Sequence, residues 1–186
     1  LILFQGRKLK YKYISGNMVE VGKESIWKNG MELSYWYPDT FVSGSQNKNG
    51  MKMKAFFQDS RVVTRYTFDK QFQGGPGLVH GGILSAAVDD LMGYAAIIHK
   101  RACVTAKLEV NYILPVQIEK EFIIEAWISG IDGKKIYAES IIFDEETIHT
   151  ETNAMFIDLG ERASEVFKQS QDTDNQLFEY KEETQY

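Results

Sequence analysis

The run "GGPGLVHGGILSAAVDDLMGYAAIIH", residues 74–99, constrains the fold more than any other part of the chain. It opens as a glycine-rich loop and continues with the composition of a helix. Between Gly81 and Ile98 the only polar side chains are Ser85, Asp89 and Asp90. A helix that is apolar on nearly every side belongs in the interior of a fold. We therefore expect a buried helix over residues 81–98, with a sheet wrapped around it.

Two stripes at helical spacing distinguish the faces of this segment. The first stripe is large and apolar, and we expect it to face the sheet; it comprises Leu84, Val88, Leu91, Ala95 and Ile98. The second stripe is small at every position but one; it comprises Gly82, Ala86, Asp89, Gly93 and Ala96. Small residues permit close approach by a second backbone or by a ligand. Asp89 is therefore predicted to lie in a narrow, largely dry groove.

A carboxylate in such a groove needs an explanation, because burying it unpaired costs several kcal/mol. Asp89 is accordingly paired, protonated or functional. A purely structural Asp89 would cap backbone groups or pair across a dimer interface, and the residues by themselves leave this alternative open. Asp90 lies about 100° further round the helix, and we interpret it as a solvated or interface charge.

The remaining body of the chain has the patterns of β-strands. Two such runs, "MKMKAFFQ" and "RVVTRYTF", precede the helix. After it, "CVTAKLEVNYI" alternates, which predicts a half-buried strand; one side carries Val104, Ala106, Leu108, Val110 and Tyr112, and the other carries Thr105, Lys107, Glu109 and Asn111. The next two runs flank Asp132-Gly133, a strong hairpin signal, and "IHTETNAMFIDLG" supplies a last strand. About six strands with one long helix inserted after the second predict an α+β domain built on one antiparallel sheet.

The chain divides into four parts. Residues 1–6, "LILFQG", end like the scar of a tag-removing protease and are set apart as a tag remnant. Residues 7–40 form an N-terminal flank that we expect to pack on the core, with "SIWKNGMELSYWYPD" as a candidate short helix. Residues 41–160 are the folded domain, entered through the polar, glycine-bounded loop "FVSGSQNKNG". Residues 161–186 form a charged tail that we expect to be partly disordered.

Composition excludes several classes of function. Of the 186 residues, 44% are hydrophobic, which is enough for the core of one domain. The formal net charge of -5 argues against a nucleic-acid binder, because no basic excess exists to neutralise phosphates. The single cysteine, Cys103, excludes an intrachain disulfide and fits a reducing compartment, so a cytoplasmic location is expected. No apolar run approaches the ~20 residues of a membrane span, and a secretory signal pattern is not apparent.

The glycine-rich loop ahead of the helix is the second chemical feature; it contains Gly74, Gly75, Pro76, Gly77, Gly81 and Gly82. Glycines let the backbone approach a ligand closely, and N–H groups at a helix start are unpaired and favour negative charge. Such amides suit either a phosphate or the oxyanion that develops on an attacked carbonyl. His80 directly precedes the helix, and it would either hydrogen-bond within the loop or polarise a bound carbonyl.

Other reactive side chains lack partners in the sequence. His99 and His149 have no surrounding cluster of metal-ligating residues, so no metal site is predicted. Cys103 is interpreted as a small core residue rather than a nucleophile. The chain has no G-x-S-x-G motif, which leaves serine-hydrolase chemistry unsupported.

Three segments, "PGLVHGGILSAAVDD", "VTAKLEVNYILPV" and "FVSGSQNKNGMKMKAFF", carry a resemblance to a known family. In the first, a His-Gly-Gly motif is followed by an acid nine residues after the His. Together they resemble the hotdog-fold thioesterases, in the branch that includes the phenylacetate-pathway thioesterases and the human mitochondrial thioesterase-superfamily members. The second segment is similar to the strand that follows the hotdog helix. The third is similar to the lead-in of bacterial members, without the cysteines often found there.

The resemblance covers roughly residues 41–160 and implies a long helix wrapped by a curved antiparallel sheet. It also implies a dimer whose active sites form between two protomers. Asp89 would be the general base or nucleophile, and Gly81 N–H of the facing protomer would bind the thioester oxygen. His80 and Gly82 would shape that loop, and Thr105 matches a strand hydroxyl that helps to position water or substrate.

This chain departs from the family pattern in the loop ahead of the helix. Several relatives place an Asn or Gln there to hold water or the carbonyl. Here Gly74 and Gly75 occupy that region and Gln73 is the nearest candidate. These three residues and Gly82 are the candidate substrate-binding set.

The implied function is hydrolysis of an acyl thioester, foremost acyl-CoA, to the free acid and thiol without a cofactor. Asp89 would activate a water or attack to give a short-lived anhydride, and the sequence favours neither route. We expect a homodimer, or a homotetramer built as a dimer of dimers. A hotdog hydratase or dehydratase is disfavoured because "FDKQFQGGPG" has no His. A non-catalytic hotdog that binds acyl-CoA stays an alternative, because the loop amide is missing.

Overall fold

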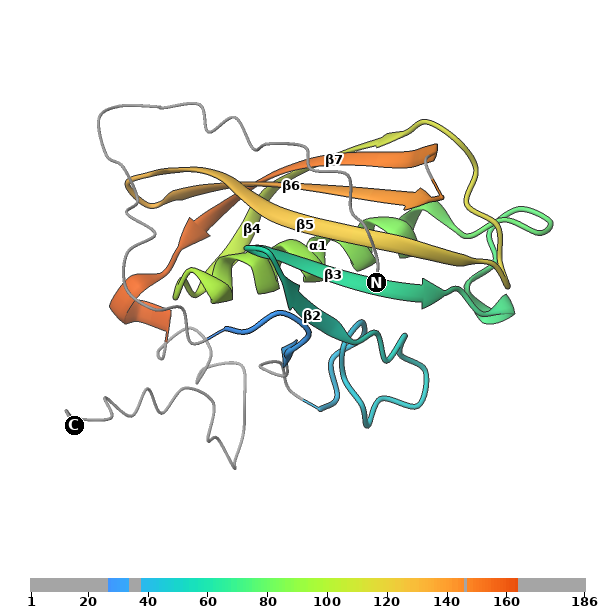
Figure 1. The fold of residues 1–186 in the computed structure, drawn as a ribbon, viewed down its shortest axis with the longest axis horizontal. Helices are drawn as coiled ribbons and strands as arrows, with labels where there is room; N and C mark the ends of the chain where they lie inside the picture. The colour runs from blue at the N-terminus through green and yellow to red at the C-terminus, as the bar shows by residue number, and fades with distance from the viewer. Residues whose placement is uncertain (1–26, 34–37, 146, 164–186) are drawn as a thin grey trace.

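The structure is a computed structural model that describes residues 27–33, 38–145 and 147–163 (Figure 1). The predicted tag remnant, most of the N-terminal flank and nearly all of the charged tail lie outside the described residues. In chain order the elements are β1 (Glu32–Leu33), β2 (Ala55–Gln58), β3 (Arg61–Thr67), η1 (Lys70–Phe72), α1 (Gly81–Ile98), β4 (Cys103–Tyr112), β5 (Glu121–Asp132), β6 (Lys135–Asp144), β7 (Thr147–Asp158) and η2 (Gly160–Arg162).

In the described part of the chain, a seven-stranded antiparallel sheet curves around one long helix, α1 (Figure 1). The strand order is β1-β2-β3-β5-β6-β7-β4, so β1 and β4 form its two edges. The predicted α+β class and hotdog arrangement are confirmed. The expected number of about six strands is low by one, because Leu33 pairs with Ala55 and adds β1 to the sheet. This strand follows a turn at Gly30, whose φ of 84° favours glycine, so the candidate short helix is wrong over the described residues 27–33.

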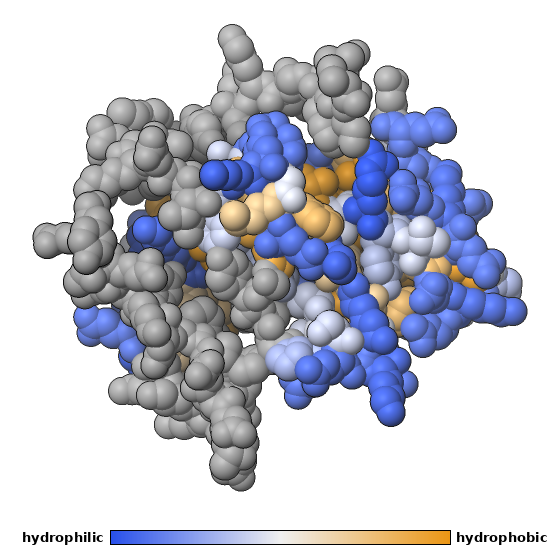
Figure 2. All heavy atoms as spheres, turned by 60° about the horizontal axis from the view of Figure 1, so that its bottom comes forward, coloured by the Kyte–Doolittle hydropathy of each residue, from blue (hydrophilic) through white to orange (hydrophobic). Residues whose placement is uncertain are grey.

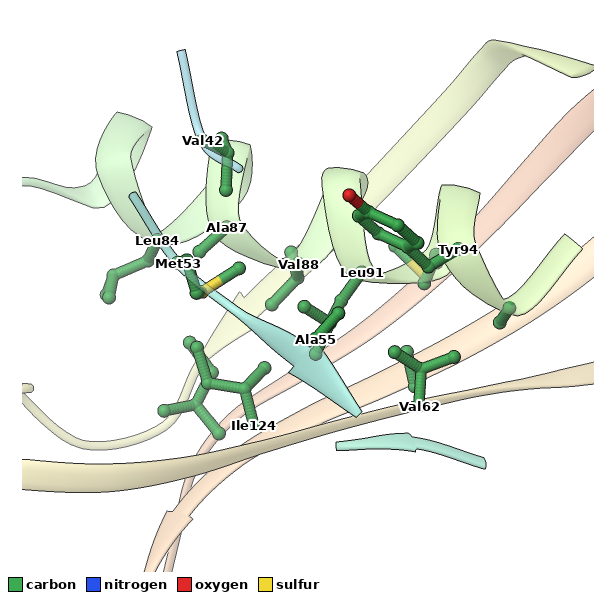
Figure 3. Close-up of a cluster of buried hydrophobic side chains, with 14 of the residues drawn as sticks. Val42, Met53, Ala55, Val62, Leu84, Ala87, Val88, Leu91, Tyr94 and Ile124 are labelled. Atoms are coloured by element: carbon green, nitrogen blue, oxygen red, sulfur yellow. The ribbon is translucent and has the colours of Figure 1, made fainter. Parts of the chain in front are cut away.

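Helix α1 is the centre of the hydrophobic core. Its large stripe lies against the sheet as predicted, and Leu84, Val88 and Leu91 are almost inaccessible to solvent. Figure 3 shows these side chains pointing toward Val62 of β3 and Ile124 of β5. Burying one such side chain contributes about 1.5–3 kcal/mol, so the stripe fixes how the helix is turned relative to the sheet.

By length and composition α1 would be able to cross a bilayer, since it has 18 residues and few charges. Within the fold, 56% of this segment is buried inside the protein. The sequence-based statement that no apolar run comes near a membrane span is therefore too strong. The sheet supplies the apolar surroundings that this helix needs.

The Asp-Gly signal marks a hairpin, as predicted. Strands β5 and β6 pair as far as Asp132 and Lys135, which leaves Gly133 and Lys134 as a two-residue turn. Gly133 has a φ of 56°, which favours glycine over other residues. The turn lies at the same end of the molecule as the end of α1 (Figure 1).

Strand β4 departs from the predicted alternation because it has a bulge between Thr105 and Lys107. Because the bulge adds one residue, the alternation of side chains beyond it is shifted by one position relative to the helix. Ahead of the bulge Thr105 pairs with buried Phe156 and faces α1, whereas beyond it Leu108 packs against the core. The prediction that Val104 shares a side with Leu108 is wrong, and Val104 is 40% exposed.

Apolar surface remains exposed on the described part of the chain. Figure 2, seen from the side on which β2 lies in Figure 1, shows hydrophobic surface between hydrophilic side chains. The exposed large hydrophobic residues are Met31, Phe41, Val104, Tyr112, Ile113 and Leu114. Four of these six belong to β4 or directly follow it, so most of the exposed large hydrophobic residues that the structure describes lie at this edge of the sheet.

Candidate active site

Helix α1 begins at Gly81, and His80 caps it. His80 Nδ1 accepts a hydrogen bond from Gly82 N–H at 2.9 Å. His80 N–H donates to Phe72 O at 2.9 Å, which fastens the loop to η1. Of the two roles considered for His80, these contacts fit the local one, in which the imidazole shapes the loop.

Gly81 is enclosed by two hydroxyl groups that the sequence did not connect with it. Tyr112, at the far end of β4, donates its hydroxyl to Gly81 O at 2.8 Å, and Ser85 Oγ lies 2.7 Å from the Tyr112 hydroxyl. A Cβ added at Gly81 would lie 3.3 Å from the Tyr112 ring. Within the described ranges nothing accepts from Gly81 N–H, as is usual for the first residue of a helix. The amide predicted to bind an oxyanion is therefore free, while its carbonyl is fixed.

The loop residues predicted to bind substrate lie together ahead of α1. Gln73 Oε1 accepts from Gly77 N–H at 3.2 Å, so its carbonyl oxygen holds the loop rather than projecting from it. Gly74 allows a close approach, because a Cβ there would lie 2.8 Å from His80 Cα. A Cβ at Gly75 would meet nothing within 4 Å. Gly75 is thus the open position of this loop.

Asp89 lies in the middle of α1 and faces β4, where Thr105 Oγ1 donates to Asp89 Oδ1 at 2.8 Å. Both side chains line a cavity of about 320 Å³, and its other lining residues are Thr40, Asp90, Gly93, Cys103, Val104 and Phe156. Burial raises the pKa of Asp89, and the Thr105 hydrogen bond opposes part of this rise. A carboxyl group with a raised pKa that opens onto a cavity is suited to proton transfer.

The interpretation of Asp90 as a solvated charge is wrong, whereas its alternative as an interface charge stays a prediction. The Ser43 side chain hydrogen-bonds to it from the loop ahead of β2 (residues 38–54), and Asp90 Oδ2 is inaccessible, with no hydrogen-bond partner in the described part of the chain. Burial raises the pKa of Asp90 to about 7; the Ser43 bond opposes the rise and the charge of Asp89 adds to it. The helical pattern gave no sign that a loop so far upstream would cover this face.

The base and the amide of one chain are too far apart to act on one carbonyl group. Asp89 and Gly81 are eight residues apart on α1. With a rise of 1.5 Å per residue, that separation is about 12 Å along the helix axis. A site that uses both groups needs one of them from a second copy of the chain.

A second cavity, of about 380 Å³, lies where β7 ends and η2 begins; its cationic lining residues are Arg101, Lys134 and Arg162. Arg101 pairs with Asp158 at 2.7 Å, whereas Lys134 and Arg162 have no ion-pair partner among the residues described. The two cavities adjoin, because Cys103 of the first pairs across strands with Asp158 of the second. The sequence did not reveal this group, since its members come from separate segments.

Cys103 is partly buried and packs against the core, as predicted. Burial, with the nearby charges of Asp158 and Asp89, raises the pKa of its thiol to about 12. A thiol with so high a pKa is a poor nucleophile.

His149 has partners in the fold that its sequence surroundings did not indicate. Its Nε2 lies 2.9 Å from Asp144 Oδ1, and its Nδ1 lies 2.8 Å from Pro115 O. These contacts tie the start of β7 to the segment after β4. The described residues contain no group of three His, Cys, Asp or Glu side chains placed to hold a metal ion.

A helix wrapped by an antiparallel sheet, with a carboxyl group facing a hydroxyl of the edge strand, has the fold of the hotdog proteins. One crystal structure of a thioesterase superfamily protein has a TM-score of 0.62 at 24% identity, over 65% of this chain and 61% of that chain. The Escherichia coli PaaI protein from the phenylacetic acid degradation operon has a TM-score of 0.55 at 15% identity, over 59% of this chain and 81% of that chain.

Similarity in sequence is more specific than similarity in fold. Residues 76–150 match the thioesterase superfamily. Over 123 residues the chain is 31% identical to the acyl-coenzyme A thioesterase THEM4 of Mus musculus, an alignment that covers 64% of this chain and 53% of that protein. In both comparisons this chain is similar to thioesterases over its central part. It spans about half the length of the curated relatives it matches.

Proposed function

We propose that this domain hydrolyses acyl-CoA thioesters to the free acid and CoA. The observation that carries the proposal is Asp89, a partly buried carboxyl group with a raised pKa, bonded to Thr105 and open to a cavity. The relatives named acyl-coenzyme A thioesterases support the choice of substrate. A thioester suits a site with so few groups, because its carbonyl is electrophilic and thiolate leaves readily.

Two routes fit the position of Asp89. In the first, Asp89 takes a proton from water while the water oxygen attacks the thioester carbonyl carbon. The C–S bond of the tetrahedral intermediate then breaks, and the Asp89 proton passes to the CoA thiolate. In the second, an Asp89 carboxylate oxygen attacks the carbonyl carbon, the C–S bond breaks and CoA leaves as the thiolate. Water then hydrolyses the resulting anhydride to the free acid, which regenerates the Asp89 carboxylate, and the proton released protonates the thiolate. Thr105 holds the Asp89 carboxyl group in either route.

Gly81 N–H of a second copy is the proposed donor to the oxyanion. One well-placed donor of this kind stabilises a transition state by roughly 3–4 kcal/mol. His80 and Gly82 keep the loop in the shape that leaves this amide free. Because the amide of the same chain is about 12 Å from Asp89 along the helix, the proposal requires a homodimer, alone or doubled into a tetramer.

The edge strand β4 is the proposed dimer surface. At the opposite edge, β1 has two residues in the described ranges, and Glu32 there pairs with Lys54. Short, charged edges discourage pairing with another chain. Strand β4 has ten residues, and Tyr112 at its end is 49% exposed. Strand β4 also carries the exposed Lys107–Glu109 ion pair, but no described strand pairs with its outer side. A long edge with exposed Val104 and Tyr112 is the one that a second copy would cover.

The cations of the second cavity are proposed to bind the phosphates of CoA. Lys134 and Arg162 are available for this because they pair with no acid in the described residues. Charge reversal in Lys134→Glu is expected to raise KM for acyl-CoA several-fold and to leave KM for the phosphate-free acyl-pantetheine unchanged. An equal effect on both thioesters would contradict the assignment. The single cysteine supports a reducing, cytoplasmic location.

Thiol release from a panel of short, long and aromatic acyl-CoAs tests the proposal. The wild type should turn over at least one class, and the near-isosteric Asp89→Asn should not, while both remain folded. If neither protein releases thiol from any thioester, the catalytic proposal fails.

Mixed dimers test whether the site is shared between chains. Gly81→Pro removes the N–H at a helix position that accepts proline, and Gly81→Ala is its control, since it keeps the N–H and adds the same Cβ. Asp89→Asn and Gly81→Pro are each expected to be inactive. When the two variants are co-expressed, half of the dimers should contain one chain of each variant. Each mixed dimer has one intact site of two, so activity should return to about a quarter of the wild-type value. A mixture as inactive as its components would exclude the shared site.

A non-catalytic acyl-CoA-binding domain is the second candidate. It is favoured by Gln73, whose side-chain oxygen accepts from Gly77 N–H instead of facing a substrate. Binding of acyl-CoA without any thiol release would select this candidate over the first.

A further inference from the structure

Asp90 lines the same cavity as Asp89 but has no part in the proposed reaction. Ser43 hydrogen-bonds to it from the loop ahead of β2. Ser43 Oγ lies 3.3 Å from Thr40 Oγ1, and Thr40 also lines the cavity. Two hydroxyl groups thus connect Asp90 to the space onto which Asp89 opens.

The surroundings of Asp90 oppose its ionisation. Its Oδ2 is inaccessible, and no hydrogen-bond donor reaches it from the described residues. The described lining of the cavity contains no Lys, Arg or His; its other ionisable groups are Asp89 on the same helix and the Cys103 thiol on β4. An ionised Asp90 would be a second negative charge beside Asp89, with no cation in the cavity to compensate it.

We propose that Asp90 sets the alkaline limit of the reaction: it carries a proton while the enzyme turns over, and its ionisation stops turnover. This inference rests on the proposed function. Hydrolysis places negative charge in the cavity twice, on the oxyanion and on the departing thiolate, and a second fixed carboxylate opposes both. The burial that raises the pKa of Asp90 to about 7 puts this ionisation close to neutral pH.

The test is the pH dependence of kcat/KM for acyl-CoA in the wild type, Asp90→Asn and Ser43→Ala. Wild-type kcat/KM should fall on the alkaline side, by about tenfold per pH unit once Asp90 is ionised. Asp90→Asn has no such ionisation, so at about pH 9 its kcat/KM should exceed that of the wild type by about tenfold or more. Ser43→Ala removes a bond that favours ionised Asp90, so its fall should begin at higher pH.

The inference is overturned if Asp90→Asn keeps the alkaline fall, or if it loses activity equally at every pH while circular dichroism shows it folded. If Asp90→Asn does not fold, the test uses Ser43→Ala instead. A Ser43→Ala variant whose kcat/KM falls at the same pH as that of the wild type overturns the inference. A wild type that hydrolyses no thioester at any pH overturns the proposed function itself. That failure differs from an active wild type whose alkaline fall does not depend on Asp90.

Discussion

Asp89 and Asp90 are neighbours on α1, yet the fold gives them opposite surroundings. Asp89 faces the edge strand β4 and accepts a hydrogen bond from Thr105. Asp90 is covered by the loop ahead of β2, where Ser43 bonds to it and one of its oxygens has no partner in the described chain. A turn of about 100° per residue is enough to separate a carboxyl group suited to react from one suited to hold a proton.

The comparison also shows why a pair of adjacent acids can stand in an apolar helix. Burial raises the pKa of both groups. Two ionised carboxylates in one cavity would repel each other, whereas one ionised and one protonated group do not. The energetic cost of the pair is therefore limited as long as Asp90 keeps its proton.

The largest expected difference between Asp89 and Asp90 is in turnover at about pH 6.5, where Asp90 still holds its proton. Asp89→Asn removes the proposed base and should lower kcat by about 10²–10⁴-fold. The measurement is thiol release at saturating acyl-CoA, with thermal unfolding as the control for folding. A loss of less than about tenfold would show that Asp89 is not the reacting group.

The second expected difference between Asp89 and Asp90 is in how each affects the stability of the fold at different pH values. Asp90 has a folded-state pKa of about 7, raised above its usual value of 3.8. The folded state therefore binds its proton more tightly than the unfolded state, and this contribution to stability is lost as pH rises through 7. A shift of this size is worth at most about 4 kcal/mol.

Asp90→Asn removes this pH-dependent penalty. Its Tm should exceed the wild-type Tm clearly at about pH 8, and the two should converge near pH 4. Asp89→Asn, one residue away, is the matched control and should give a smaller gain. Equal gains at both pH values would mean that the stabilisation does not come from ionisation.

Thr105→Val should produce a moderate effect on the Asp89 side alone. The substitution removes the hydroxyl that donates to Asp89 and lowers its pKa. The pKa of Asp89 should rise further, so the acid limb of the kcat/KM profile should move to higher pH, with about a tenfold lower rate near its midpoint. Thr105→Ser keeps the hydroxyl and should keep the wild-type limb. An unchanged limb in Thr105→Val would separate Thr105 from the base.

Ser43→Ala should produce the smallest effect, on the Asp90 side alone. The hydrogen bond it removes favours ionised Asp90. The free energy of unfolding should fall by about 1 kcal/mol at about pH 8 and by less at pH 5, because bonds to charged groups are the stronger ones. Denaturant titration at the two pH values measures this difference. A larger loss at the lower pH would contradict the arrangement.

Much of the fold could be predicted from sequence periodicity alone. An apolar helix needs a sheet to cover it, and the stripe through Leu84, Val88 and Leu91 determines the side that it covers. The hairpin at Gly133 follows from the requirement of its turn for a positive φ. Of the small residues predicted to surround Asp89 on α1, Gly93 lines the cavity. These features are local, so a pattern along the chain is sufficient to indicate them.

The contacts of the site were decided only by the tertiary structure. The bulge in β4 turns Thr105 toward α1, although strict alternation puts it on the side opposite Leu108. Where a bulge falls depends on how β4 and β7 pair, and a period of two cannot reveal it. Asp90 Oδ2 is inaccessible, and the Ser43 side chain that hydrogen-bonds to Asp90 lies 47 positions earlier in the chain. The sequence determined which carboxyl groups enter the core; long-range packing determined which one reacts and which one holds its proton in this proposal.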